Sequence, residues 1–283
     1  MEIDSTKPRS LTIGRREFVW GERTYLMGVI NVSPDSFAGD GLSDADAAVA
    51  QGHRFVEEGA DLLDVGGQST RPDFEELSTE EEARRVVPVI ERLVAELPVP
   101  VSVDSYKPPV ARAALEAGAH LLNDIWGFRC DRRLAELSVE FAVPAVVMHN
   151  QRGRAFRDVI GDIRAGLEAS IAIAVESGLP RERMIVDPGF GFGWTVEQNL
   201  EMLRRLAELR DLGLPLLIGT SRKSAIGAVL DGAPVEDRLW GTAATVALAV
   251  AAGVDIVRVH DVAQMRKVAR MADAIVRGRL QRR

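Results

Sequence analysis

The sequence repeats one pattern eight times between residues 25 and 277, a short apolar segment followed by a segment of helical periodicity. Short apolar runs predict buried strands, whereas apolar residues recurring every three or four positions predict helices. The predicted strands cover 25–30, 61–65, 100–104, 120–124, 143–149, 183–187, 214–220 and 255–260. The predicted helices cover 44–58, 80–96, 109–117, 131–141, 159–176, 196–209, 224–230, 237–252 and 263–277.

Strands that are apolar almost throughout are covered on both faces, as in parallel sheets with flanking helices. Eight such units within about 250 residues, with no linker between them, favour a closed (β/α)8 TIM barrel. An open doubly wound sheet is the alternative, but it usually carries a glycine-rich loop after its first strand, where this chain reads NVSPDSF. We therefore predict a single barrel domain over 1–283, which includes a short N-terminal β-hairpin over 10–24.

Composition restricts the partners and the compartment. The net charge is −7 and the basic residues are scattered, which argues against nucleic acid or an anionic membrane as a partner. Cys130 is the single cysteine, so no intrachain disulfide can form, which favours a cytoplasmic protein. The first ten residues lack the apolar core of a signal peptide, and the most apolar stretch, 242–259, is interrupted by charged residues.

Every predicted strand is followed by polar or charged residues. These strand-end residues are Asn31, Asp64, Asp104, Asn123, Asp124, His149, Asp187, Lys223, Arg258 and His260. In a barrel all strands end on one face, where active sites lie. One such carboxylate alone is more simply a helix cap or loop anchor, but the full set favours a functional site.

The residue types indicate the ligand. Asp104, Asn123 and Asp187 suit a neutral planar ligand with an amidine-like edge, because a carboxylate accepts two parallel N–H donors. Divalent-metal binding by the same carboxylates is the alternative. The set lacks the close histidine and cysteine pattern of a zinc site.

A second group suits an anion. Arg258 and His260 are two residues apart on a strand and so point to the same side. Together with Asn31 on the neighbouring first strand they could hold a phosphate, often accompanied by Mg²⁺. The alternative is that Arg258 pairs with Asp255 or Asp261. Phe192 could lie against a planar ligand or belong to the core.

Several segments together resemble the dihydropteroate synthase family. They read MGVINVSPDSF, DVGGQSTRP, VSVDSYKP, NDIWG, VMHN, DPGFGFG, GTSRKS and VRVHDV, and they span most of the chain in the family order. The resemblance implies a transferase of folate biosynthesis that joins p-aminobenzoate to 6-hydroxymethyl-7,8-dihydropterin diphosphate and releases diphosphate. It also implies Mg²⁺ as cofactor and a homodimer.

The resemblance also implies roles for individual residues. The pterin would contact Asp104, Asn123, Ile125, Met148, Asp187 and Lys223. The diphosphate would contact Asn31, Arg258 and His260, with Asn31 also touching Mg²⁺. The p-aminobenzoate would contact Thr70, Arg71, Pro72, Phe192 and Ser224. The catalytic set would be Asp35, Arg71, Lys223, Arg258 and His260, with Asp35 stabilising a cation-like pterin methylene in a dissociative displacement. The loops over 32–42 and 66–77 would close over the reactants.

The chain departs from the family pattern at Gln68, Asp73, Trp126 and Trp194. Two other functions use the same barrel, a methyltetrahydrofolate-dependent methyltransferase and a non-catalytic pterin-binding paralogue. The methyltransferase would not need Arg71, Lys223 or the Arg258 and His260 pair. A non-catalytic paralogue would be expected to have lost loop residues such as Asp35 and Thr70, which are present.

Overall fold

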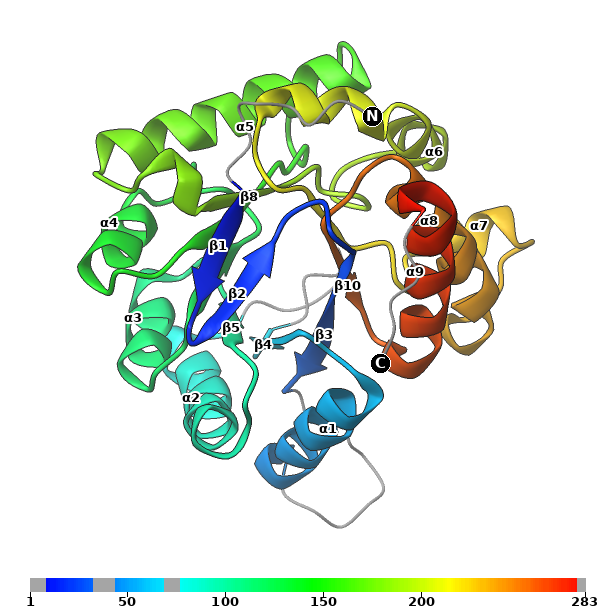
Figure 1. Cartoon of the computed structure of the whole chain (residues 1–283). Helices are drawn as coiled ribbons and strands as arrows, with labels where there is room; N and C mark the ends of the chain where they lie inside the picture. Colours follow the sequence, from blue (N-terminus) through cyan, green and yellow to red (C-terminus); the bar gives the residue numbers. More distant parts are fainter. Residues whose placement is uncertain (1–8, 33–43, 69–76, 279–283) are drawn as a thin grey trace.

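The computed structural model describes residues 9–32, 44–68 and 77–278. Its strands and helices alternate around a barrel, with helices outside and strands inside (Figure 1). The barrel strands are β3 (Tyr25–Asn31), β4 (Leu62–Gly66), β5 (Val101–Asp104), β6 (Leu121–Asp124), β7 (Ala145–Met148), β8 (Met184–Asp187), β9 (Leu217–Ile218) and β10 (Ile256–Val259). The α-helices are α1 (Asp44–Glu58), α2 (Thr79–Glu96), α3 (Pro108–Glu116), α4 (Arg133–Glu140), α5 (Val159–Glu176), α6 (Val196–Arg204), α7 (Ser224–Val229), α8 (Leu239–Ala251) and α9 (Val262–Arg277).

The sheet closes on itself, which confirms the predicted barrel. Its strands follow the order β8-β7-β6-β5-β4-β3-β10-β9, and all neighbours are parallel. A parallel bridge between Val186 and Leu216 joins the two outer strands, supported by a 2.9 Å bond from Val186 N to Pro215 O. The polar ends of the strands therefore gather on one rim.

Two predicted helices are shorter than their patterns. The helix expected over 196–209 ends as α6 at Arg204 and continues as the 3₁₀ segment η3 (Leu206–Leu212). Leu206, Leu209 and Leu212 recur every third residue and are all buried, which matches the threefold period of a 3₁₀ helix. The helix expected from 237 likewise begins as the 3₁₀ segment η4 (Val235–Arg238) before α8.

The N-terminal hairpin covers the opposite end of the barrel from that rim. It consists of β1 (Ser10–Ile13) and β2 (Arg16–Val19), paired antiparallel, and it lies across the barrel in Figure 1. Phe18 and Trp20 join one buried cluster with inward residues of the barrel strands, among them Met27, Leu62 and Leu121. The predicted hairpin is thus confirmed, and it fills the end of the barrel at which the strands begin.

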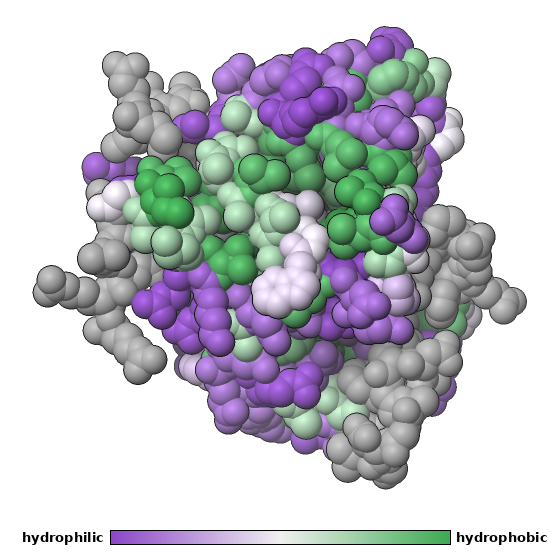
Figure 2. Space-filling view, turned by 90° about the vertical axis from the view of Figure 1, so that its right-hand side faces the viewer, coloured by the Kyte–Doolittle hydropathy of each residue, from purple (hydrophilic) through white to green (hydrophobic). Residues whose placement is uncertain are grey.

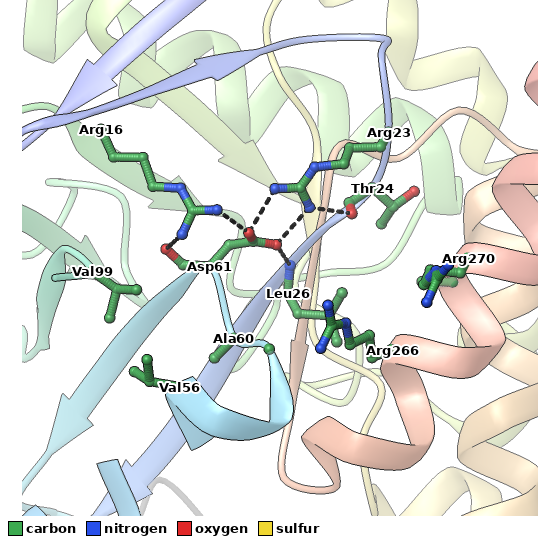
Figure 3. A pocket seen from close by; sticks show the side chains of 12 residues that line it. Arg16, Arg23, Thr24, Leu26, Val56, Ala60, Asp61, Val99, Arg266 and Arg270 are labelled. Atoms are coloured by element: carbon green, nitrogen blue, oxygen red, sulfur yellow. Dashed lines mark hydrogen bonds and ion pairs between the residues drawn. The ribbon is translucent and has the colours of Figure 1, made fainter. Parts of the chain in front are cut away.

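Asp61 ties the hairpin to the barrel (Figure 3). Its Oδ1 accepts bonds of 2.6 Å from both Arg16 and Arg23, and its Oδ2 accepts from Arg23 Nη1 (2.8 Å) and Leu26 N (2.9 Å). These groups line a cavity of about 380 Å³. The cavity lies at the strand N-termini, whereas barrel chemistry occurs at the C-termini, so we assign Asp61 a structural role.

Asp61→Ala is expected to lower the free energy of unfolding by about 3 kcal/mol, because removing a buried charge leaves its partners uncompensated. Urea denaturation measures this loss. Asp46→Ala is the matched control, since the Asp46–Arg92 pair is exposed on both sides and should contribute less than about 1 kcal/mol. Equal losses in the two variants would contradict the role given to Asp61.

A second carboxylate joins the last helix to the first barrel strand. Asp273 in α9 accepts from Thr24 N (2.8 Å) and Thr24 Oγ1 (2.9 Å), next to the start of β3. Arg277 donates to the same carboxylate (2.8 Å) and to Gly21 O (3.0 Å). The two ends of the described chain are therefore fastened to each other.

Candidate active site

Arg258 lies at the centre of the rim on β10. Its Nε donates to Asp64 Oδ2 and its Nη2 to Asp104 Oδ2, each at 2.6 Å. Asn123 Nδ2 donates to the same Asp64 oxygen at 3.0 Å. Side chains from β4, β5, β6 and β10 thus belong to one hydrogen-bonded network around this guanidinium. Its alternative partners, Asp255 and Asp261, instead accept from Leu216 N and from Arg222.

The charged side chains around Arg258 shift one another's pKa values. Burial opposes the charge of Arg258, but the carboxylates of Asp64 and Asp104 outweigh it and raise the pKa of the guanidinium. Burial raises the pKa of Asp104 to about 7, against the opposing effect of Arg258. Burial thus disfavours the charged form of Asp104, and a bound donor or cation would favour it.

Asp187 and Lys223 form a second charged group beside an apolar wall. Burial raises the pKa of Asp187 to about 6, although Gly189 N donates to it at 2.7 Å and Lys223 favours its charge. Burial lowers the pKa of Lys223 to about 8. The Lys223 Nζ lies 4.1 Å from the centre of the Phe192 ring. Both groups could thus exchange protons or hydrogen bonds near neutral pH.

The apolar wall consists of Ile125, Met148 and Phe192, all buried, with Tyr106 and Trp126 packed against them. Ile125 and Phe192 follow β6 and β8, and Met148 is the last residue of β7. The turn after β8 can lie close to the end of β7 because Gly189 has no side chain. A Cβ there, at φ +77°, would lie 1.8 Å from His149 O. The wall gives a planar ligand a surface next to the carboxylates.

His260 and Asn31 lie at the remaining part of the rim. His260 contacts Ser221 Oγ through both its backbone N (3.2 Å) and its Nδ1 (3.0 Å). Burial, together with Arg258 and Arg222, lowers the pKa of His260 to about 3, so the imidazole is neutral. Asn31 ends β3 and is exposed. Ser224 begins α7 and is also exposed, directly after Lys223.

Two strand-end residues serve loops rather than the rim. Asp124 accepts from Trp126 N (2.9 Å) and Phe128 N (2.6 Å), which closes the turn after β6. His149 bonds to Gln151 Oε1 at 2.9 Å and packs against Trp194. For the carboxylate of Asp124 the loop-anchor interpretation is confirmed. Trp194, one of the departures from the family pattern, belongs to the main core.

Lys107 forms hydrogen bonds with the described residues on either side of 69–76. Lys107 Nζ donates to Gln68 Oε1 (2.8 Å) and Leu77 O (2.6 Å). It also pairs with the buried carboxylate of Glu82 at 2.9 Å. Asp35, Thr70, Arg71, Pro72 and Asp73 lie outside the described residues.

Sequence reasoning missed Asp64 as the partner of Arg258, and it missed Lys107 and Arg152. The guanidinium of Arg152 lies 4.9 Å from the centre of the Phe192 ring. A pairing across 194 residues, such as Arg258 with Asp64, leaves no local pattern. Arg152 and Lys107 stand in polar loop segments where an arginine or lysine is ordinary, so no signal distinguished them.

Comparison with known proteins agrees with this geometry. Residues 27–260 match the model of the family described as pterin binding enzyme. The chain is 46% identical to the dihydropteroate synthase of Clostridium beijerinckii (94% of this chain, 100% of the relative) and 45% identical to that of Bacillus subtilis (97% and 94%).

Solved structures are equally similar. The dihydropteroate synthase of Clostridium difficile, in the presence of pteroic acid, superimposes with a TM-score of 0.89 at 46% identity (92% of this chain, 99% of that chain). The Xanthomonas albilineans enzyme in complex with 7,8-dihydropteroate gives 0.87 at 40% identity (94% and 98%). The chain therefore belongs to the pterin-binding enzyme family, among the dihydropteroate synthases.

Proposed function

We propose that this chain joins 6-hydroxymethyl-7,8-dihydropterin diphosphate to p-aminobenzoate, giving 7,8-dihydropteroate and diphosphate. One observation carries the proposal. The buried side chains of Asn123 and Asp187 and the half-buried carboxylate of Asp104 lie beside an apolar wall, with the cations of Lys223 and Arg258 next to them. Relatives solved with pteroic acid and dihydropteroate support the choice of substrates.

The pterin would take the part of the site around Asp187 and Asp104. Its N–H edge would donate to the two carboxylates, and its ring would lie on Ile125 and Met148. Asn123 and Lys223 would contact its remaining polar atoms. A carboxylate must be ionised to accept these bonds, and a ligand that supplies them would favour ionisation of both aspartates.

The diphosphate would take the side of Asn31, Arg258 and His260. Arg258 would keep Asp64 and exchange Asp104 for a phosphate oxygen, since a guanidinium offers several donors in one plane. The neutral His260 would donate one hydrogen bond, and phosphate charge beside it would raise its pKa. Ser221, which contacts His260, holds the ring in place.

Mg²⁺ fits the exposed amide of Asn31 as a hard oxygen ligand. The described parts of the chain contain no cluster of three or more His, Cys, Asp or Glu side chains that could hold a metal. Mg²⁺ commonly binds few protein oxygens and keeps waters and phosphate oxygens as its other ligands. When bound, it would neutralise charge that develops on the leaving diphosphate.

The reaction breaks the C–O bond between the pterin methylene and the diphosphate, and the electron pair leaves with the diphosphate. Arg258 and His260 stabilise that charge from fixed positions. The arylamine nitrogen then forms the new C–N bond and releases a proton to solvent. Asp35, outside the described residues, is our candidate for stabilising the cation-like methylene, and Arg71, Thr70 and Pro72 for binding p-aminobenzoate with Phe192 and Ser224.

A direct assay tests the proposed function. The protein is incubated with the dihydropterin diphosphate, p-aminobenzoate and Mg²⁺, and dihydropteroate and free diphosphate are quantified by chromatography. Equal amounts of the two products are expected. Pterin binding without either product would instead indicate a non-catalytic binding protein. Omission of p-aminobenzoate is the control for simple hydrolysis.

We also propose that the protein acts as a homodimer through α8 and α9. The sequence of α8, LWGTAATVALAVA, has no charged residue, yet Trp240 is 79% and Leu248 61% exposed. Met271 and Ile275, one turn apart on α9, are 63% and 71% exposed. Figure 2 shows apolar surface gathered on this side of the molecule. A helix that is apolar all round is normally covered, and a second copy would cover it by twofold symmetry.

Sedimentation equilibrium should give twice the chain mass for the wild type. Leu248→Glu should give the monomer, because a charge would be buried at the interface. Val139→Glu is the control, since Val139 is a partly exposed apolar residue on α4, away from this face. A monomeric wild type at micromolar concentration would overturn the proposed dimer.

The proposed compartment is the cytoplasm. Within the residues that the structure covers, no helix is both long and apolar enough to cross a membrane. The single cysteine, Cys130, is exposed and leaves no possibility of an intrachain disulfide. A reducing compartment suits such a chain.

A further inference from the structure

The cavity beside Asp61, at the end of the barrel where the strands begin, is lined mainly by positive charge. Its volume of about 380 Å³ lies in the usual range of small-molecule sites. Arg16, Arg23, Arg266 and Arg270 line it, and Asp61 is the one acidic residue among its described lining residues. Figure 3 shows Arg16 and Arg23 on either side of Asp61, and the other two arginines on α9. We call this space the hairpin cavity.

The carboxylate of Asp61 does not neutralise the two arginines that it holds. Its oxygens accept from both Arg16 and Arg23, so one negative charge is shared between two guanidinium groups. The pair of arginines therefore keeps a net positive charge, although their side chains are only 33% and 28% exposed. Partial burial strengthens the attraction of this pair for an anion, because less water screens it.

Arg266 adds a cation that has no acidic partner among the described residues. Its Nη1 donates to the backbone carbonyl of Glu58 at 3.2 Å, and that acceptor carries no charge. The carboxylate of Glu58 lies against other groups, since Oε2 accepts from Ala263 N (3.3 Å) and Oε1 is 3.8 Å from Arg54 Nε. The net charge of the whole chain is −7, so the hairpin cavity is positive against the overall charge of the protein.

The chain after α1 fixes the guanidinium of Arg266 at the cavity. Gly59, with φ +99°, has no side chain, and a Cβ there would lie 2.4 Å from Arg266 Nη1. The guanidinium can therefore lie directly against the backbone, where the bond to Glu58 O holds it. A cation that is already held in place loses less freedom when a ligand binds, as expected of a preorganised binding residue.

We propose that the hairpin cavity binds an anion that carries a phosphate group, with Arg16, Arg23 and Arg266 as its ligands. A guanidinium presents N–H donors in one plane that match two oxygens of a phosphate. Arg16 and Arg23 keep their bonds to Asp61 and donate through their remaining N–H groups. A cavity of this size has room for more than a monatomic ion, which favours a diphosphate or a phosphate ester.

Isothermal titration with inorganic diphosphate at low salt, without Mg²⁺, tests the proposal by counting sites. The wild type should bind two diphosphates per chain, one at the rim and one in the hairpin cavity. Arg258→Gln should lose the rim site and keep the other, so the hairpin cavity can be measured alone. Adding Arg266→Gln should weaken this remaining site about 10- to 100-fold, as loss of charge-assisted hydrogen bonds gives.

Lys267→Gln is the matched control, because Lys267 is the next residue on α9, is exposed and does not line the cavity. Its loss changes the net charge equally and should leave the affinity unchanged. Equal weakening by Lys267→Gln and Arg266→Gln would show a general attraction to positive surface and overturn the proposal. Absence of binding in Arg258→Gln, or binding that is independent of Arg266, would also overturn it.

Titration of Arg258→Gln with adenosine triphosphate distinguishes two sources of the phosphate group. Tighter binding than that of diphosphate would assign the site to a phosphate ester, and weaker binding would assign it to the free anion. Both results support the site, provided that Arg266→Gln weakens them. The inference does not depend on the proposed function, since a wild type that makes no dihydropteroate can still bind diphosphate through Arg266.

Discussion

Arg258→Gln is expected to lower kcat/KM about a thousandfold and to lower the free energy of unfolding by about 3 kcal/mol. The first effect follows from losing a fixed cation at the leaving diphosphate, where one preorganised donor contributes about 10²–10³. The second follows because Asp64 is fully buried and would keep only the amide of Asn123 as a partner among the described residues. Initial rates and urea denaturation measure the two effects.

The double variant Asp64→Asn with Arg258→Gln separates these effects. Removing both charges should recover part of the lost stability, because the fully buried carboxylate of Asp64 is gone and only the half-buried Asp104 still lacks its ion pair with Arg258. Turnover should stay low, since the cation is still absent. If turnover recovered with stability, Arg258 would act only as the counterion of Asp64 and the mechanism proposed for diphosphate release would be wrong.

Asp187→Asn is expected to weaken pterin binding about a hundredfold. Asparagine has the same shape, but its amide presents donors to the donor edge of the ligand, and the charge that strengthens each bond is lost. Isothermal titration with a pterin that does not itself titrate near neutral pH measures the loss. Asp211→Asn is the control, because the side chain of Asp211 is exposed. Asn199 cannot serve as a control site, because its side chain accepts a hydrogen bond from Gly191 N.

The pH dependence of the same titration identifies the groups. The pKa values of Asp187 and Asp104 are raised to about 6 and about 7, and binding requires both ionised. Wild-type affinity should therefore reach its full value only above about pH 8 and fall as the pH drops through these values, with uptake of up to two protons. In the Asp187→Asn variant the affinity should fall in one step only, the step that belongs to Asp104. A variant with the wild-type pH profile would show that Asp187 does not contact the ligand.

The barrel could be predicted from the sequence because strand and helix periods are local signals that repeat eight times. Prediction was weakest where local signals are short. The strand expected over 214–220 is reduced to Leu217–Ile218. Before these two residues, Leu216 makes one isolated bridge to Val186, and its N–H donates to the carboxylate of Asp255. Pro215 has no N–H and contributes only its carbonyl to Val186.

The residues of the site could be predicted from the sequence, but the contacts between their side chains could not. Asp104, Asn123, Asp187, Lys223, Arg258 and His260 do gather at one rim, because all strands of a barrel end there. The charge state of His260 could not be read from sequence, since it depends on burial and on Arg222 from another loop. The same holds for the contact of Arg152 with the ring of Phe192, since these residues are 40 positions apart. Long-range contacts of this kind leave no trace in spacing.

The bond between Thr24 and Asp273 has a consequence for how the protein is made. During synthesis the first barrel strand leaves the ribosome long before residue 273 exists, and its pairing partner β10 is also made near the end. The first strand therefore waits with one edge uncovered until almost the whole chain has emerged. Unpaired edges of this kind expose a growing chain to aggregation, so chain completion and barrel closure must follow each other closely.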